Sequence, residues 1–297
     1  MRLAIVGDAA LGWRLAGLET KRGNDVVVLA AALSGDASPG IAHQPYHDRA
    51  ELDALLEAHS PDVTVVFAPR RGAAPTIAAD DLIAAVAAQG ARVVVWGCAT
   101  VYGWAADNNG HALGEEAQLT GRSDLGAAVD TDTAARRLAE ERPEDVHLFR
   151  AGATLAGSPS AQLAALGRLR LVPTPADRRF VQLLDLRDAI EILQQAIRGE
   201  NPGVYNVAAD GIMRVEDVCR AMGRTATRMP RGLYKVASIL CRVGGRVESI
   251  SGLVAFTGGT PILDNARLKT HFGFRPRYST RDALAAARDG GRGAADA

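Results

Sequence analysis

The chain has 297 residues, and its 34 basic and 34 acidic side chains give a formal net charge of zero. This balance provides no long-range field that would attract nucleic acid or an anionic membrane. The three cysteines show no C-x-x-C spacing, which argues against a zinc site and against a disulfide framework and predicts a cytoplasmic protein. No stretch approaches the roughly 18 apolar residues of a transmembrane helix.

Short apolar segments rich in β-branched residues alternate with helical segments in the first half of the chain. The predicted strands are 3–6, 26–29, 63–67, 93–96 and 147–149, and the predicted helices are 11–22, 50–59, 77–89 and 125–141. Strands that are apolar on both faces belong to a parallel sheet covered by helices. The predicted fold class is therefore α/β, a doubly wound parallel sheet of the Rossmann type with a smaller C-terminal α/β lobe.

The second half of the chain is less regular. Three prolines lie in a loop-rich crossing, before a predicted helix at 185–198 and a short strand at 204–207. We predict a dinucleotide-binding lobe over 1–157, to which 181–208 returns, and a smaller substrate-type lobe over 158–288. Residues 289–297 contain Gly, Ala and charged residues without apolar periodicity, so we expect a disordered tail.

The segment between the first strand and the first helix is rich in small residues: Gly7, Asp8, Ala9, Ala10, Leu11 and Gly12. In this position a glycine-rich loop lets the backbone approach a pyrophosphate at the helix N-terminus. The third glycine of the usual fingerprint is missing, and Asp8 places a carboxylate beside the expected phosphates. Two interpretations are open, a phosphate-binding loop and a tight strand-to-helix turn.

The second predicted strand ends at Ala30, where dinucleotide-binding proteins usually carry a carboxylate that binds the adenosine ribose. No arginine follows at 31–35 to bind a 2′-phosphate, and the nearest acid is Asp36 in a loop. The sequence therefore does not discriminate between NAD and NADP.

Several motifs occur in a familiar order along nearly the whole chain. They are the small-residue loop at 7–12, the strand and loop at 62–69, the strand end at 96–103 with Val101-Tyr102-Gly103, the Arg150-Ala151-Gly152 step, and the segments 180–189, 203–207 and 272–276. This series resembles the extended short-chain dehydrogenase/reductase family, the NAD-dependent epimerases and dehydratases typified by UDP-glucose 4-epimerase. The resemblance implies a dinucleotide site that includes Ala68, Pro69, Cys98 and Gly152, with Tyr102 near the substrate.

The family's chemistry requires a tyrosine, a lysine four residues later, and a Ser or Thr hydroxyl at the end of the fifth strand. The lysine is needed because a phenol with a pKa near 10 must be brought toward neutrality by a nearby cation. No tyrosine in this chain has a lysine four residues later. Ala128 and Asp132 fall at the tyrosine and lysine places, and Cys98 falls at the hydroxyl place. The sequence therefore predicts an atypical active site.

Cys98 and Asp132 are the remaining candidates for chemistry at these places. A cysteine nucleophile needs a lowered pKa, and no histidine lies near Cys98 in the sequence, so the favoured interpretation is a buried small residue. Asp130 and Asp132 could act as a carboxylate base. The favoured interpretation is that they, with Thr131 or Thr133, bind free N–H groups at a helix start.

A basic stretch without acids lies between Asp217 and Glu248. Apolar residues at helical spacing predict an amphipathic helix with a basic face over 230–247. The resemblance implies that arginines of this lobe hold the diphosphate of a substrate, which points to Arg231 and Lys235. A patch for a membrane surface or a partner and a merely solvated face are the alternatives.

Two functions fit these residues. The first is an atypical epimerase/dehydratase-like protein that binds NAD or NADP and a nucleotide-sugar-like ligand without the Tyr-Lys relay. The alternative is a non-catalytic dinucleotide or metabolite sensor, or a partner subunit of an active relative. For either function we expect a small-molecule ligand, no nucleic acid and no metal. The family's four-helix interface also implies a homodimer through the helices at 77–89 and 125–141.

Overall fold

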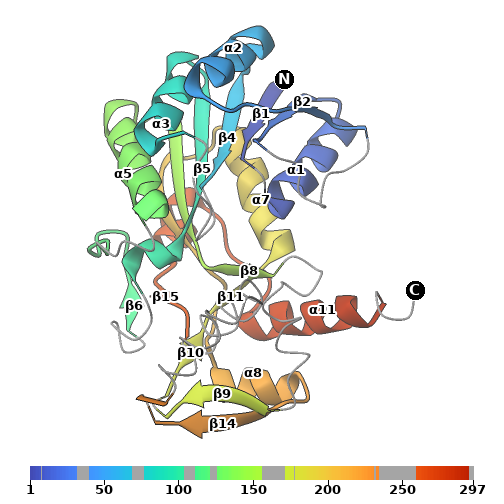
Figure 1. Cartoon of the computed structure of the whole chain (residues 1–297), viewed down its shortest axis with the longest axis vertical. Helices are drawn as coiled ribbons and strands as arrows, with labels where there is room; N and C mark the ends of the chain where they lie inside the picture. Colours follow the sequence, from blue (N-terminus) through green and yellow to red (C-terminus); the bar gives the residue numbers. More distant parts are fainter. Residues whose placement is uncertain are drawn as a thin grey trace.

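A seven-stranded parallel sheet forms the centre of the larger lobe (Figure 1). The structure is a computed structural model that describes residues 1–7, 9–31, 40–68, 77–103, 111–120, 126–155, 171–176, 178–230, 232–233 and 259–293. The strands are β1 (Arg2–Val6), β2 (Asp25–Leu29), β3 (Ala42–Gln44), β4 (Val63–Phe67), β5 (Arg92–Cys98), β7 (Val146–Ala151) and β12 (Gly203–Val207). Their order is β12-β7-β5-β4-β1-β2-β3, and all neighbours are parallel. This confirms the predicted doubly wound sheet.

Helices cover both faces of this sheet (Figure 1). One face carries α1 (Ala10–Lys21) and α7 (Leu186–Ile197), and the other carries α2 (Arg49–His59), α3 (Ala79–Ala88) and α5 (Gly126–Glu141). Because side chains alternate along a strand, Leu3 and Ile5 of β1 pack toward α1 and α7, whereas Ala4 and Val6 pack toward the other layer. A fully buried Val or Leu contributes about 1.5–3 kcal/mol, so the two apolar layers hold the helices on the sheet.

The strands and helices of the larger lobe agree closely with the predicted segments. Each predicted element there begins and ends within two residues of the observed one. The edge strand β3 was not predicted, because its sequence Ala-His-Gln contains no apolar run. Elsewhere the apolar pattern identified the elements correctly, since both faces of the sheet are covered and its strands are apolar throughout.

Outside the large sheet the strands are short and paired in twos. The pairs are β6 (Ala112–Leu113) with β15 (Ile262–Leu263), β8 (Ala153–Leu155) with β11 (Leu183–Asp185), β9 (Leu171–Pro175) with β14 (Thr225–Met229), and β10 (Phe180–Val181) with β13 (Met213–Arg214). Two helices, α8 (Val215–Ala221) and α11 (Thr280–Gly293), pack with some of these strands around a separate apolar core that contains Val181, Val218 and Leu284. None of these elements was predicted; the strands and α8 have only two to seven residues, too few for a periodic pattern to show.

The C-terminal helix α11 was not predicted and extends into the segment expected to be disordered. We predicted disorder from residue 289, but α11 continues to Gly293. The helix begins at Thr280, where the Ser279 and Asp282 side chains hydrogen-bond each other, and its buried Ala283, Leu284 and Ala287 anchor it to the smaller core. Anchoring by this apolar stripe extends the helix into a glycine-rich sequence that carries no apolar signal of its own. Residues 294–297 lie outside the described residues.

Candidate functional site

The predicted dinucleotide-binding residues meet at one edge of the large sheet. Gly7, Ala68 and Gly152 directly follow β1, β4 and β7, and Cys98 ends β5. The carboxyl ends of parallel strands share one edge, so the topology brings these residues together. Backbone hydrogen bonds hold the edge in register: Gly7 N–H donates to Leu29 O over 2.8 Å, Ala68 N–H to Trp96 O over 3.1 Å, and Gly152 N–H to Val207 O over 2.8 Å.

Phe67 explains the two glycines of the loop after β1. Gly7 has φ +107°, a conformation that favours glycine, and a Cβ there would lie 2.8 Å from the Phe67 carbonyl oxygen. A Cβ on Gly12 would lie 2.9 Å from the Phe67 ring. Close packing of β1, α1 and β4 therefore requires both glycines whatever ligand is bound. The tight-turn interpretation accounts for them without excluding a phosphate.

The N-cap of α1 offers no side chain to the first N–H groups of the helix. The N-cap residue is Ala9, in extended conformation, which has no side-chain acceptor. A 12-residue helix leaves such groups available to a phosphate at this end. Ala10, Leu11 and Gly12 form its first turn. Asp8, the carboxylate expected beside the phosphates, lies outside the described residues.

Ala30 is enclosed at the end of β2. It is 1% exposed, its N–H donates to Gln44 O over 3.3 Å, and the His43 ring nitrogen lies 3.3 Å from its carbonyl oxygen. The His43 ring also packs against Trp13 of α1, with centroids 5.9 Å apart. The methyl group of Ala30 is thus buried beside β3, at the strand end where dinucleotide-binding proteins usually carry a ribose-binding carboxylate.

A buried ion pair includes Asp132, the residue that the sequence resemblance placed at the lysine position. Asp132 of α5 accepts two hydrogen bonds from Arg150 of β7, from Nε to Oδ1 and from Nη2 to Oδ2, each 2.8 Å long. The two side chains are 1% and 0% exposed. This fork geometry satisfies both carboxylate oxygens and offsets the cost of burying the two charges.

The ion pair continues into a buried polar network. Arg150 Nη1 donates to the Tyr102 hydroxyl over 2.8 Å and to the Glu115 carbonyl oxygen over 2.7 Å. The Tyr102 hydroxyl donates to Asn206 Oδ1 over 2.8 Å. Asn206 in turn donates from its side chain to Leu113 O and from its backbone to Glu115 Oε1, both over 2.8 Å. The network therefore ties α5, β7 and β12 to the segment that follows β5.

The charges of this network resist proton transfer. Burial raises the pKa of Tyr102 above 10, and the opposing effect of Arg150 does not reverse this, so the phenol stays neutral and donates a hydrogen bond. Burial alone would lower the pKa of Arg150, but hydrogen bonding and attraction to Asp132 raise it above its usual value. Arg150 therefore keeps its charge, and the Tyr102 hydroxyl is engaged with Arg150 and Asn206.

The expected capping role of Asp132 is wrong. Asp132 lies in the second turn of α5, where its side chain is 2% exposed and faces β7. The hydroxyls of Thr131 and Thr133 donate to Ala127 O and Val129 O, one turn earlier, and therefore do not accept from N–H groups at the helix start in these bonds. The helix already begins at residue 126, so these residues are too far along it to act as caps.

The expectation that Cys98 is buried is also wrong. Cys98 is exposed at the end of β5, with Thr100 Oγ1 donating to its Sγ over 3.1 Å. The burial of β5 ends at Trp96, because the last residues of the strand extend past the helices that cover it. The tyrosine place, Ala128, is 8% exposed and packs with Tyr102 in a small apolar cluster.

Some predicted site residues lie outside the described residues. They are Asp8, Pro69, Arg231 and Lys235, together with most of the predicted amphipathic helix at 230–247. Other residues of the site were missed. Arg150 and Asn206 were noted only within motifs, although a charged or amide side chain in an otherwise apolar strand is itself a signal, because burial requires it to find a partner.

Comparison of the sequence with curated proteins finds few relatives. No protein-family model matches the chain. An uncharacterized protein of Mycobacterium tuberculosis and one of Mycobacterium bovis are each 26% identical over 160 residues, which cover 53% of this chain. The chain spans only 42% of the length of these curated relatives.

Solved structures match over the whole chain. A dTDP-glucose 4,6-dehydratase from Bacillus anthracis, in complex with NAD, has a TM-score of 0.73 at 12% identity and covers 100% of this chain and 98% of its own. The UDP-glucose 4-epimerase of Thermotoga maritima, with UDP-glucose, has a TM-score of 0.72 at 14% identity and covers 99% of each chain. The UDP-glucose 4-epimerase of Thermus thermophilus, with NAD, has a TM-score of 0.71 at 15% identity and covers 98% and 99%.

The chain therefore shares the fold of these solved structures, a Rossmann-type parallel sheet with a smaller second lobe, as its sequence pattern predicted. Within the described ranges, no group of three or more His, Cys, Asp or Glu side chains could hold a metal ion. No helix of the part of the chain that the structure describes is long and apolar enough to cross a membrane.

Proposed function

We propose that this protein binds NAD or NADP at the carboxyl edge of the large sheet, with a nucleotide-linked ligand beside it, and lacks the Tyr-Lys relay. The observation that carries the proposal is the Asp132–Arg150 ion pair, which fills the lysine place with a neutralised carboxylate. The binding half of the proposal draws support from structural neighbours that hold NAD or UDP-glucose.

The open N-terminus of α1 supports dinucleotide binding. Ala9 leaves N–H groups of the first turn available, and Gly7 and Gly12 keep the adjoining backbone free of side chains. The buried methyl of Ala30 cannot bind a ribose hydroxyl, so we expect weaker discrimination between NAD and NADP than a carboxylate would provide.

Calorimetric titration with NAD, NADH, NADP and NADPH tests binding, and Ala9→Asp locates it. An aspartate at this N-cap should stabilise α1 by about 0.5–2 kcal/mol and repel a phosphate from the same N–H groups. We expect affinity to fall about tenfold while the melting temperature holds or rises, which separates lost binding from unfolding. Ala54→Asp, on the exposed surface of α2, adds the same charge elsewhere and should leave affinity unchanged.

A non-catalytic sensor, or a partner subunit of an active relative, is the second candidate function. It is favoured by the same ion pair, because both oxygens of Asp132 accept hydrogen bonds from Arg150 and none is left to act as a base. Incubation with NAD and a panel of UDP- and dTDP-sugars distinguishes the two. Accumulation of reduced nicotinamide or an altered sugar would establish an enzyme; cofactor binding without either change would establish the sensor.

The proposed homodimer would form through the outer faces of α3 and α5. These helices pack side by side, and their exposed surfaces carry Asp80 and Arg137, whose charged atoms approach to 3.7 Å. Light scattering of the purified chain should give twice the monomer mass. A monomer over the full concentration range would remove the dimer from the proposal.

A further inference from the structure

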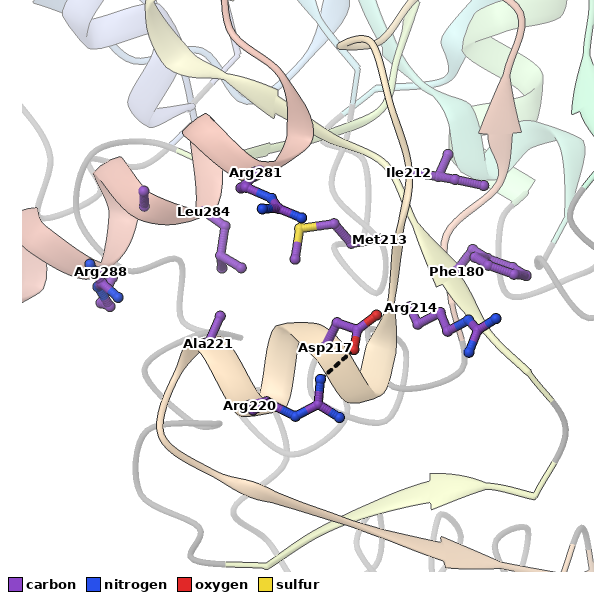
Figure 2. Close-up of a pocket in the computed structure, with 11 residues that line it drawn as sticks. Phe180, Ile212, Met213, Arg214, Asp217, Arg220, Ala221, Arg281, Leu284 and Arg288 are labelled. Carbon is purple, nitrogen blue, oxygen red and sulfur yellow. Dashed lines mark hydrogen bonds and ion pairs between the residues drawn. The ribbon is translucent and has the colours of Figure 1, made fainter.

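An arginine-rimmed cavity lies in the smaller lobe, between α8 and α11 and beside β13 (Figure 2). Its volume is about 640 Å³, within the range of about 300–1,000 Å³ that small-molecule sites commonly have. The elements that line it belong to the smaller lobe, whereas the proposed dinucleotide site lies at the edge of the large sheet. The cavity is therefore a separate place for a ligand.

The floor of the cavity is apolar and firmly held. Leu284 of α11 is 3% exposed and belongs to the core of the smaller lobe, with Met213 packed against that core. Ala221 and Ala285 keep the space between the two helices open, because their side chains are short. Ile212 is 44% exposed at this cavity, an unusual position for a large apolar side chain.

The rim of the cavity is cationic. Arg214, Arg220, Arg281 and Arg288 line it together with one carboxylate, that of Asp217. Asp217 Oδ1 already accepts a hydrogen bond from Arg220 Nη1 over 2.7 Å. Arg214 forms no ion pair with any residue that the structure describes. Arg281 likewise forms no ion pair with a residue that the structure describes, so Arg214 and Arg281 are the two cations of the rim that a ligand could engage.

The spacing along the helices places these charges around the apolar floor. Arg281, Leu284, Ala285 and Arg288 follow an i, i+3, i+4, i+7 pattern, so they share one face of α11. The two arginines of this face lie about 10 Å apart along the helix axis. Across the cavity, Arg220 and Ala221 of α8 repeat the combination of a cation with a small apolar residue (Figure 2).

We propose that this cavity binds an organic anion, a phosphate monoester or carboxylate with an aliphatic or aromatic body. The body would cover Met213 and Leu284 and release water from them, while the acidic group would accept paired hydrogen bonds from guanidinium forks. The site does not depend on the dinucleotide proposal.

Calorimetric titration with octyl phosphate tests this site. We expect one molecule to bind per chain, with inorganic phosphate and 1-octanol each binding about tenfold more weakly, because each satisfies only one half of the site. Arg214→Glu and Arg281→Glu should each lower the affinity for octyl phosphate about tenfold. Arg275→Glu, an exposed residue outside the lining, makes the same charge change and should leave it unaltered.

Two further measurements keep the result decisive. Melting temperatures of the variants should match that of the parent chain, because Arg214 is exposed and Arg281 lies on the surface of α11. Saturation with NAD should not displace octyl phosphate. Binding that survives both Glu substitutions, or that NAD abolishes, would overturn the assignment, and so would the absence of binding at millimolar concentration. None of these outcomes bears on whether NAD itself binds.

Discussion

The two lobes use arginine in opposite ways. In the larger lobe Arg150 is fully buried, and its guanidinium donates hydrogen bonds to Asp132, Tyr102 and the Glu115 carbonyl oxygen. In the smaller lobe four arginines surround an open apolar cavity with one carboxylate among them. A fully partnered guanidinium fixes elements relative to one another, whereas Arg214 and Arg281, which form no ion pair among the described residues, are the groups that the proposed ligand would engage.

The largest effect is expected from breaking the buried pair. Asp132→Ala leaves the Arg150 guanidinium charged and without its carboxylate inside the protein, which should cost about 3–5 kcal/mol of the free energy of unfolding. Urea denaturation monitored by circular dichroism measures it. A loss below about 1 kcal/mol would mean that the pair does not hold α5 on β7.

A double variant sharpens this test. In Asp132→Leu with Arg150→Met, apolar side chains of similar volume replace both charges, so the loss should be well below the sum of the single losses. Tyr102 would still lose its cationic neighbour, and Asn206 keeps its bonds to Leu113 and Glu115. If the loss in free energy of unfolding for the double variant equals the sum of the two single losses, Asp132 and Arg150 do not interact as the short hydrogen bonds between them indicate.

Acid should destabilise the larger lobe through His147. Burial, with a smaller contribution from Arg92, lowers the pKa of His147 to about 4 from 6.5. The folded state thus resists protonation, so stability is full above pH 6.5 and is lost as the pH falls toward 4. At about pH 5 the loss attributable to this residue should be about 2 kcal/mol.

The His147→Phe variant checks this assignment. The imidazole stacks on Phe149, with centroids 5.8 Å apart, so a phenyl ring fits the same stack, although the contact of the ring nitrogen with Glu200 O is lost. Its urea midpoint should vary less between about pH 8 and about pH 5 than that of the parent chain. An equal pH dependence in both proteins would assign the acid sensitivity to other groups.

The smallest effect is expected at a surface pair. Arg277 Nη2 donates to Glu191 Oε1 over 2.6 Å, but the two side chains are 67% and 39% exposed. Arg277→Ala should therefore change the free energy of unfolding by about 0.2–1 kcal/mol, and added salt should reduce the difference. A change as large as that of Asp132→Ala would remove the distinction between buried and exposed arginines.

Sequence patterns identified the larger lobe because its strands are apolar on both faces, as in 63–67 and 93–96. The same reasoning missed the smaller lobe, where short strands such as β10 and β13 have two residues each. For the site, the sequence resemblance predicted Asp132 at about the place of the family's lysine. Its partner was not predicted, because Arg150 lies 18 residues away on another element.

The sequence by itself determined the doubly wound sheet, the small residues of the loop after β1, and the absence of a lysine four residues after any tyrosine. Only the tertiary structure decided that Phe67 requires Gly7 and Gly12, that Asp132 is neutralised by Arg150, and that α8 and α11 enclose a cationic cavity. Periodicity reports which face of an element is buried. Periodicity does not show which side chains, distant in the sequence, contact each other at that face. Hydrogen bonds and cavities depend on those contacts.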